Sequence, residues 1–88
     1  NQKQIIILCK DHVEIRVDGL KEFFTWKEFR SFATFNVIKN DMRDDVLSFR
    51  SKGKEIIVGS FLNEEDKAIL KDEISRIIQK LNAVGFAN

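Results

Sequence analysis

Residues 46–66 have the sequence VLSFRSKGKEIIVGSFLNEED, and the fold follows from this stretch. Its first part contains two runs of mixed apolar and polar residues on either side of Lys52-Gly53, a dipeptide suited to a tight turn. A two-residue loop there pairs Phe49 with Ile56, which keeps apolar side chains together on one face. We therefore predict an antiparallel hairpin formed by Val46 to Ser51 and Lys54 to Ser60.

The end of the same stretch begins the longest predicted element. Asn63 is suited to cap a helix, and the acidic residues 64–66 lie where the helix dipole favours negative charge. We predict an amphipathic helix that extends to Gly85 and packs against the strands. Its apolar stripe recurs at spacings of four and three, with Ile78 beside it: Leu70, Ile74, Ile77, Leu81 and Val84.

Two strands are predicted near the start of the chain. The β-branched run from Ile5 to Cys9 indicates a first strand within Lys3 to Lys10. Apolar residues then alternate with charged ones, as in a strand with one buried face and one face in water. The apolar positions of this second strand are Val13, Ile15 and Val17.

Asp18-Gly19 indicates a hairpin that leads into a third strand over Leu20 to Thr25. The length of its loop decides the register. A two-residue loop places Ile15 opposite Glu22, whereas a three-residue loop places it opposite Phe23. Only the second pairing keeps apolar partners together, and the pattern leaves both registers open.

A short helical turn and a fourth strand are predicted next. Thr25 and Glu28 have the spacing of a capping box, in which both side chains bind free backbone N–H groups of a helix start, so we expect the turn to include Trp26. An extended pattern of apolar residues returns from Arg30 to Ile38 and predicts the strand. The polar stretch Lys39 to Asp45 predicts a loop.

Length and charge limit the possible functions. We predict that residues 1–88 form one domain of the α+β class, too small for a large enclosed active site. With 15 basic and 14 acidic residues the net charge is +1, which lacks the excess expected for phosphate binding, so we expect no nucleic-acid partner. The single cysteine indicates a reducing compartment, and we expect a cytoplasmic location.

Residues with reactive or metal-binding chemistry are few. Cys9 and His12 lie close in sequence, but a structural zinc site needs four such ligands, so we predict a buried thiol and an exposed turn histidine. Asp41, Asp44 and Asp45 share one predicted loop that lacks the glycine and terminal glutamate of a calcium loop. We predict no catalytic, cofactor-binding or metal-binding residue, and therefore a protein that is not an enzyme.

The basic tip of the predicted hairpin at residues 46–60 is the candidate binding surface. Arg50, Lys52 and Lys54 surround its turn and can contact an anionic surface such as lipid headgroups. Lys10 and Arg16 lie near other predicted turns and join this group if the hairpin tips gather at one end of a barrel. The competing interpretation is that these charges only protect exposed turns and edges, as in many natural sheets.

The segment Arg30 to Phe35, RSFATF, is similar in part to an RNA-binding strand that stacks bases on exposed aromatic residues. It has Ser31 where that motif has glycine and Thr34 where it has a second aromatic residue. We expect these phenylalanines to fill the core. A small nucleic-acid-binding protein that uses this strand is the alternative function.

The chain resembles bacterial pleckstrin-homology-like domains, such as those of the YcxB-like kind and related uncharacterised families, over about Val13 to Ile78. Trp26-Lys27-Glu28-Phe29 is similar to the Trp-x-x-Ile turn of these families, and Val46-Leu47-Ser48-Phe49 is similar to their apolar strand. Gly53 to Phe61, followed by Leu62-Asn63-Glu64-Glu65-Asp66, resembles their last strand and the Leu-x-x-Glu-Glu start of their helix.

The resemblance implies a meander of about six antiparallel strands in a partly closed barrel, capped by one C-terminal amphipathic helix. Members of these families usually carry two transmembrane helices before the domain. We therefore expect the cytosolic domain of a small bacterial membrane protein, located at the inner face of the cell membrane. Its expected function is that of a non-enzymatic interaction or regulatory module that binds a protein partner or an anionic membrane surface, with a homo-oligomer as one form of partnership.

Overall fold

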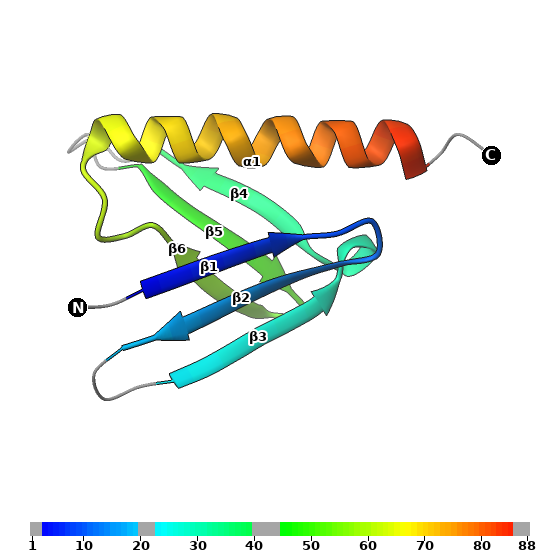
Figure 1. The fold of residues 1–88 in the computed structure, drawn as a ribbon, viewed down its shortest axis with the longest axis horizontal. Helices are drawn as coiled ribbons and strands as arrows, with labels where there is room; N and C mark the ends of the chain where they lie inside the picture. The colour runs from blue at the N-terminus through cyan, green and yellow to red at the C-terminus, as the bar shows by residue number, and fades with distance from the viewer. Residues whose placement is uncertain (1–2, 20–22, 40–44, 86–88) are drawn as a thin grey trace.

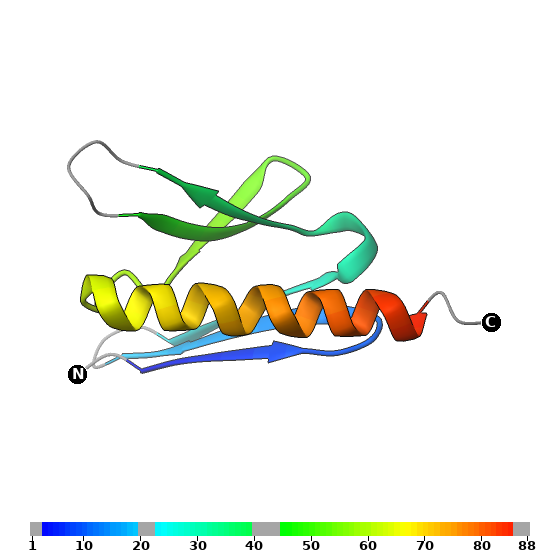
Figure 2. The same cartoon turned by 90° about the horizontal axis from the view of Figure 1, so that it is seen from above.

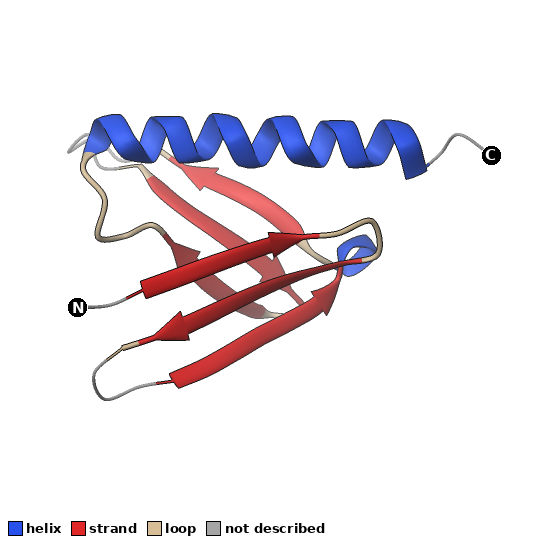
Figure 3. Cartoon of the chain, viewed as in Figure 1, coloured by secondary structure: helices blue, strands red, loops and turns tan. Residues whose placement is uncertain are grey.

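The computed structural model describes residues 3–19, 23–39 and 45–85 of the chain. These residues form an α+β fold with six strands, one short 3-10 helix and one long α-helix (Figure 3). The fold class and the single C-terminal helix are as the sequence predicts. The elements are β1 (Lys3–Leu8), β2 (His12–Asp18), β3 (Phe23–Phe29), η1 (Arg30–Phe32), β4 (Thr34–Ile38), β5 (Val46–Ser51), β6 (Lys54–Val58) and α1 (Glu64–Gly85).

The strands form two separate antiparallel sheets, one with the order β1-β2-β3 and one with the order β4-β5-β6 (Figure 1). Both sheets lie on the same side of α1, which runs along the line where they face each other (Figure 2). The expected partly closed barrel is not confirmed among the described strands, because the chain turns through η1 between β3 and β4 and these two strands do not pair.

The first sheet is built around β2, whose alternating apolar residues face the core. Val13, Ile15 and Val17 are all buried, as their alternation predicts. Ile15 lies opposite Trp26, and Asp18 pairs with Phe23. Both registers considered for this hairpin are therefore wrong, and the third strand continues to Phe29, beyond its expected end at Thr25. Residues 20–22 lie outside the described part of the chain.

The helical turn expected at Trp26 is also wrong, because this residue lies within β3. Pairing along the whole of β2 overrides the local capping signal of Thr25 and Glu28, since only an extended chain gives every residue of β2 a partner on this side. The turn occurs later, as η1, and it has no side-chain cap. The expected strand over Arg30 to Ile38 therefore begins only at Thr34.

The second sheet contains the hairpin that the sequence predicts. Phe49 pairs with Ile56 and Leu47 pairs with Val58 across a two-residue turn, as expected. The turn residues Lys52 and Gly53 have φ angles of 52° and 78°, so both adopt the left-handed conformation that matches the twist of the strands. Gly53 adopts this conformation without the steric cost that a side chain brings.

The helix begins with the predicted cap, since the backbone N–H of Asp66 donates to Oδ1 of Asn63 at 2.7 Å. Ile74 is 2% exposed at the centre of the apolar stripe, and Leu70 and Ile78 pack against the same core. Ile77 is only half-buried and lies outside this core, which corrects its expected place. It lies about 60° around the helix axis from Ile74, at the edge of the stripe.

In the described part of the chain, eight buried apolar residues form the core that joins the two sheets and the helix. Trp26 is partly buried against them, with its ring centroid 6.4 Å from that of Phe49 on the opposite sheet. The edge strands β1 and β6 are linked by the side chain of Gln4. Its Nε2 donates to the carbonyl of Ile57 at 3.3 Å, and its Oε1 accepts from the N–H of Gly59 at 2.8 Å.

We expect Ile74→Ala to lower the free energy of unfolding by about 2 to 5 kcal/mol, because it leaves a cavity between both sheets and the helix. Ile69→Ala removes the same atoms from a side chain of the same helix that is 59% exposed, and it should cost under about 0.5 kcal/mol. Denaturant unfolding followed by circular dichroism measures both values. Equal losses in the two variants would show that this face of the helix does not form the core.

Candidate functional site

Three connecting segments of the chain meet at one end of the molecule: the β1–β2 turn, η1 and the β5–β6 turn. The backbone N–H of Arg30 in η1 donates to the carbonyl of Asp11 at 2.8 Å, which fixes η1 against the β1–β2 turn. Figure 1 shows this turn and η1 side by side at the end of the molecule away from the N-terminus. The β5–β6 turn reaches the same place, since Nζ of Lys52 lies 5.0 Å from the centroid of the Phe32 ring. Residues from both sheets therefore meet here.

Two exposed phenylalanines form the apolar part of this end. Phe29 is 59% exposed and Phe32 is 56% exposed, and their ring centroids lie 6.2 Å apart in an edge-to-face arrangement. Phe29 ends β3 opposite His12, and η1 contains no buried residue, so neither ring has a place in the core. The contact between Lys52 and Phe32 has the geometry of a cation–π interaction.

We call the surface formed by Phe29, Phe32, Lys52 and Lys54 the aromatic–basic tip. The turn chemistry of the hairpin predicts the position of its lysines. The sequence pattern does not predict that the two phenylalanines are surface residues, because it indicates a helical turn at Phe29 and a strand at Phe32. The two phenylalanines are three residues apart in the sequence. Residues with this spacing lie on one side of a helical turn, so the spacing could have shown that the two rings are neighbours.

The other predicted basic residues are partly neutralised or lie elsewhere. Arg50 lies on the face of β5 that points away from the core. On this face its Nη2 contacts Oε2 of Glu55 at 3.1 Å. Arg16 lies within β2, and its ion pair with Glu14 at 2.6 Å holds the pKa of that carboxyl below its usual range. Lys10 lies in the β1–β2 turn, at the same end as the aromatic–basic tip. The described structure thus groups Lys52 and Lys54 with the phenylalanines.

Glu28 connects this tip to the interior of the molecule. Its side chain is only 19% exposed, with Oε1 3.0 Å from the backbone nitrogen of Phe29 and Oε2 4.0 Å from Nζ of Lys52. The hydrogen bond from the Phe29 N–H lowers the pKa of Glu28 most, and the charges of Lys52 and Lys54 add to this effect against the opposing desolvation. The ionised carboxylate therefore attracts the lysines of the second sheet toward the first.

Cys9 and His12 lie at the two ends of the β1–β2 turn. The backbone N–H of Cys9 donates to the carbonyl of His12 at 2.9 Å and closes the β1–β2 turn. Both side chains are half-buried, which corrects the expected buried thiol and exposed histidine. Among the described residues no three His, Cys, Asp or Glu side chains are grouped as metal ligands would be.

The acidic loop considered as a calcium site lies mostly outside the described residues, which do not include Asp41 or Asp44. Asp45 is described, and it forms an ion pair with Lys39 at 3.1 Å.

The RNA-binding strand considered for Arg30 to Phe35 is not formed, because its first three residues belong to η1. Phe35 lies on β4 and is half-buried, with its ring centroid 5.1 Å from that of Phe49. It therefore packs in the interior, as expected for a core residue, whereas Phe32 lies on the surface.

Comparisons with known proteins find no similar protein: no family model, no curated protein and no solved structure matches the chain. In the part of the chain that the structure describes, no helix combines the length and the apolar character needed to cross a membrane.

We expect Glu28→Gln to destabilise the protein at neutral pH and to lose this effect in acid. The pKa of Glu28 is lower in the folded protein, so its stabilising contribution is complete above the unfolded pKa and is lost as the pH falls through the folded pKa. Denaturant unfolding of both proteins at about pH 7 and about pH 3 measures the change. A difference in unfolding free energy that is the same at both pH values would contradict this role.

Proposed function

We propose that this protein is a non-enzymatic interaction module that docks on an anionic membrane surface through its aromatic–basic tip. The observation that carries the proposal is the pair of exposed rings, Phe29 and Phe32, with Lys52 against one of them. Adjacent large apolar side chains on a protein surface are typical of interaction sites, because their exposure to water is unfavourable. Positive charge beside them favours an anionic partner.

A membrane surface satisfies both parts of the tip at once. Each lysine near an anionic bilayer contributes about 1 kcal/mol, and burial of a phenylalanine contributes about 1.5 to 3 kcal/mol when it is complete. Rings at the headgroup boundary are only partly buried, so we expect weak and salt-sensitive attachment. Such affinity suits a domain that is held close to the bilayer by another part of the same protein, because tethering raises its local concentration.

We also propose the pleckstrin-homology-like architecture and the location at a bacterial cell membrane that the family resemblance implies. Two antiparallel three-stranded sheets followed by one C-terminal helix have the element order of a pleckstrin-homology-like domain, which supports this fold without its partly closed barrel. The proposed location is the inner face of a bacterial cell membrane, where anionic lipids attract basic protein surfaces. There the protein acts as the cytosolic, regulatory domain of a small membrane protein.

We expect the protein to sediment with phosphatidylglycerol vesicles at low salt and not with phosphatidylcholine vesicles. The double charge reversal Lys52→Glu with Lys54→Glu should abolish this binding, because it replaces two attractions by two repulsions. Phe29→Ser with Phe32→Ser should weaken the binding and remove the part that persists at higher salt, since apolar contact is not screened by ions. Vesicle cosedimentation over a range of salt concentrations measures both effects.

Matched control variants change the same residue types elsewhere on the surface. Lys71→Glu with Lys80→Glu alters the net charge by the same amount on α1, and Phe61→Ser removes a ring that is also exposed. Both controls should retain vesicle binding if the tip is the docking surface. Loss of binding in the controls, or no binding of the original protein at low salt, would contradict the proposal. In that case a protein partner, including a second copy of this chain, becomes the better hypothesis.

A further inference from the structure

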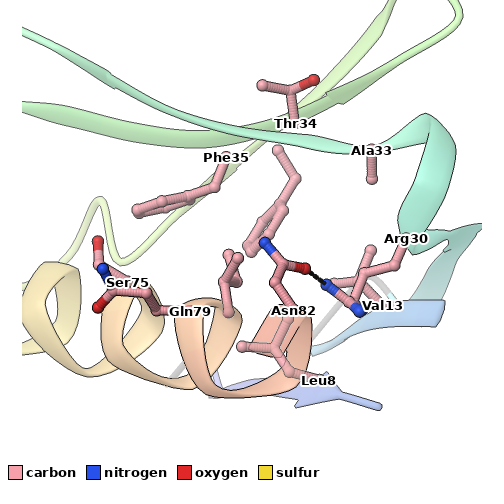
Figure 4. Close-up of a pocket in the computed structure, with 11 residues that line it drawn as sticks. Leu8, Val13, Arg30, Ala33, Thr34, Phe35, Ser75, Gln79 and Asn82 are labelled. Atoms are coloured by element: carbon pink, nitrogen blue, oxygen red, sulfur yellow. Dashed lines mark hydrogen bonds between the residues drawn. The ribbon is translucent and has the colours of Figure 1, made fainter. Parts of the chain in front are cut away.

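A cavity of about 460 Å³ lies between α1, β4 and the ends of β1 and β2. Figure 4 shows it between the helix and β4, with Phe35 toward one end and Arg30 and Asn82 at the other. Its volume is within the range of about 300 to 1,000 Å³ that is usual for small-molecule sites. The cavity is open to solvent, so a ligand can enter it without unfolding of an element.

The walls of this cavity are apolar where they meet the core. Phe35 and Phe49 line it from the second sheet, Leu8 and Val13 line it from the first, and Ile78 lines it from the helix. Polar side chains of α1, including Ser75 and Gln79, lie along the same cavity. Ser75, Gln79 and Asn82 follow one another at spacings of four and three, so they form one polar stripe beside the apolar stripe of the helix.

Among the described residues that line the cavity, Arg30 is the only one with a cationic side chain. Its Nε donates to the carbonyl of Lys10 at 2.8 Å, and its Nη1 donates to Oδ1 of Asn82 at 2.6 Å. Both acceptors are uncharged. Among the described residues no carboxylate lies within 4.0 Å of this guanidinium, in contrast to Arg16, Arg50 and Arg76, which each contact a glutamate. The charge is therefore fixed in position but not neutralised.

A fixed guanidinium beside an apolar cavity requires an anion that also carries an apolar group. Arginine has five N–H donors, and two of them are used here, so donors remain for a carboxylate. A single cation in the lining matches a single negative charge better than the double charge of a phosphate monoester. The two existing hydrogen bonds hold the guanidinium in place before a ligand arrives, which lowers the entropic cost of binding.

We propose that this cavity binds an amphiphilic monocarboxylate of the medium-chain fatty acid class. The carboxylate contacts the guanidinium of Arg30, and the alkyl chain lies against Phe35, Phe49 and Ile78. This site is separate from the aromatic–basic tip, although η1 contributes to both. The inference therefore does not depend on the proposed membrane docking.

Isothermal titration with decanoate, below its micelle-forming concentration, tests the proposal on the unmodified protein. Decanol has the chain without the charge, and acetate has the charge without the chain. We expect decanoate to bind at least tenfold more tightly than either, and to raise the thermal midpoint of unfolding in a concentration-dependent way. Binding of decanol as tight as that of decanoate, or no binding of decanoate up to its solubility limit, would overturn the proposal.

Variants assign the binding to this cavity. Arg30→Gln should weaken decanoate binding at least tenfold. The control Arg76→Gln removes an exposed arginine from α1, the helix that lines the cavity, and it should leave decanoate binding unchanged. Because Arg30 also holds η1, Ala33→Leu provides a second variant that fills the cavity from its wall without removing the charge. Unchanged binding in the folded Ala33→Leu protein would overturn the proposal.

The tip variant Lys52→Glu with Lys54→Glu separates this proposal from membrane docking. It should bind decanoate with the affinity of the original protein while it fails to bind vesicles. Loss of decanoate binding in this variant would show that the fatty acid binds at the tip and would overturn the cavity proposal.

Discussion

The two sheets of this protein share no backbone pairing among the described strands, so their arrangement depends on contacts between side chains. Phe49 is the centre of these contacts, because it meets Phe35 on its own sheet and Trp26 on the other. Ile74 of the helix closes the same core from the side. Gln4 adds a polar link, since its side-chain amide forms hydrogen bonds with the backbone of Ile57 in β6 and of Gly59 just after it. Every surface assembled from both sheets therefore depends on this core.

The parts of the fold that the sequence predicts correctly have local causes. The Lys52-Gly53 hairpin follows from turn chemistry and alternation, and the helix follows from the cap at Asn63 and its apolar stripe. The prediction for the third strand is wrong because the position of this strand depends on a partner that is distant in the sequence. Trp26 lies in an apparent capping box, yet its pairing with Ile15 gives more burial and more backbone hydrogen bonds than a short turn could. Local signals cannot show which of these effects is larger.

The same distinction applies to the candidate sites. Lys52 could be predicted at the tip because a turn residue of a hairpin is exposed in any arrangement of the sheets. The exposure of Phe32 could not be predicted, because it depends on η1, which replaces the first part of an expected strand. Arg30 was expected on that strand, and η1 instead directs it toward Asn82 across a distance of 52 residues in the sequence. The tip and the cavity are thus products of one short turn that only the assembled structure shows.

We propose that residues from both sheets form one membrane-docking surface. Nuclear magnetic resonance of the protein on phosphatidylglycerol nanodiscs with spin-labelled headgroups tests this claim most directly, because the label broadens the resonances of residues close to the bilayer. We expect the amide signals of Phe29 and Phe32 from one side, and of Lys52 and Lys54 from the other, to be broadened together. Broadening confined to α1, or to the residues of only one sheet, would contradict it.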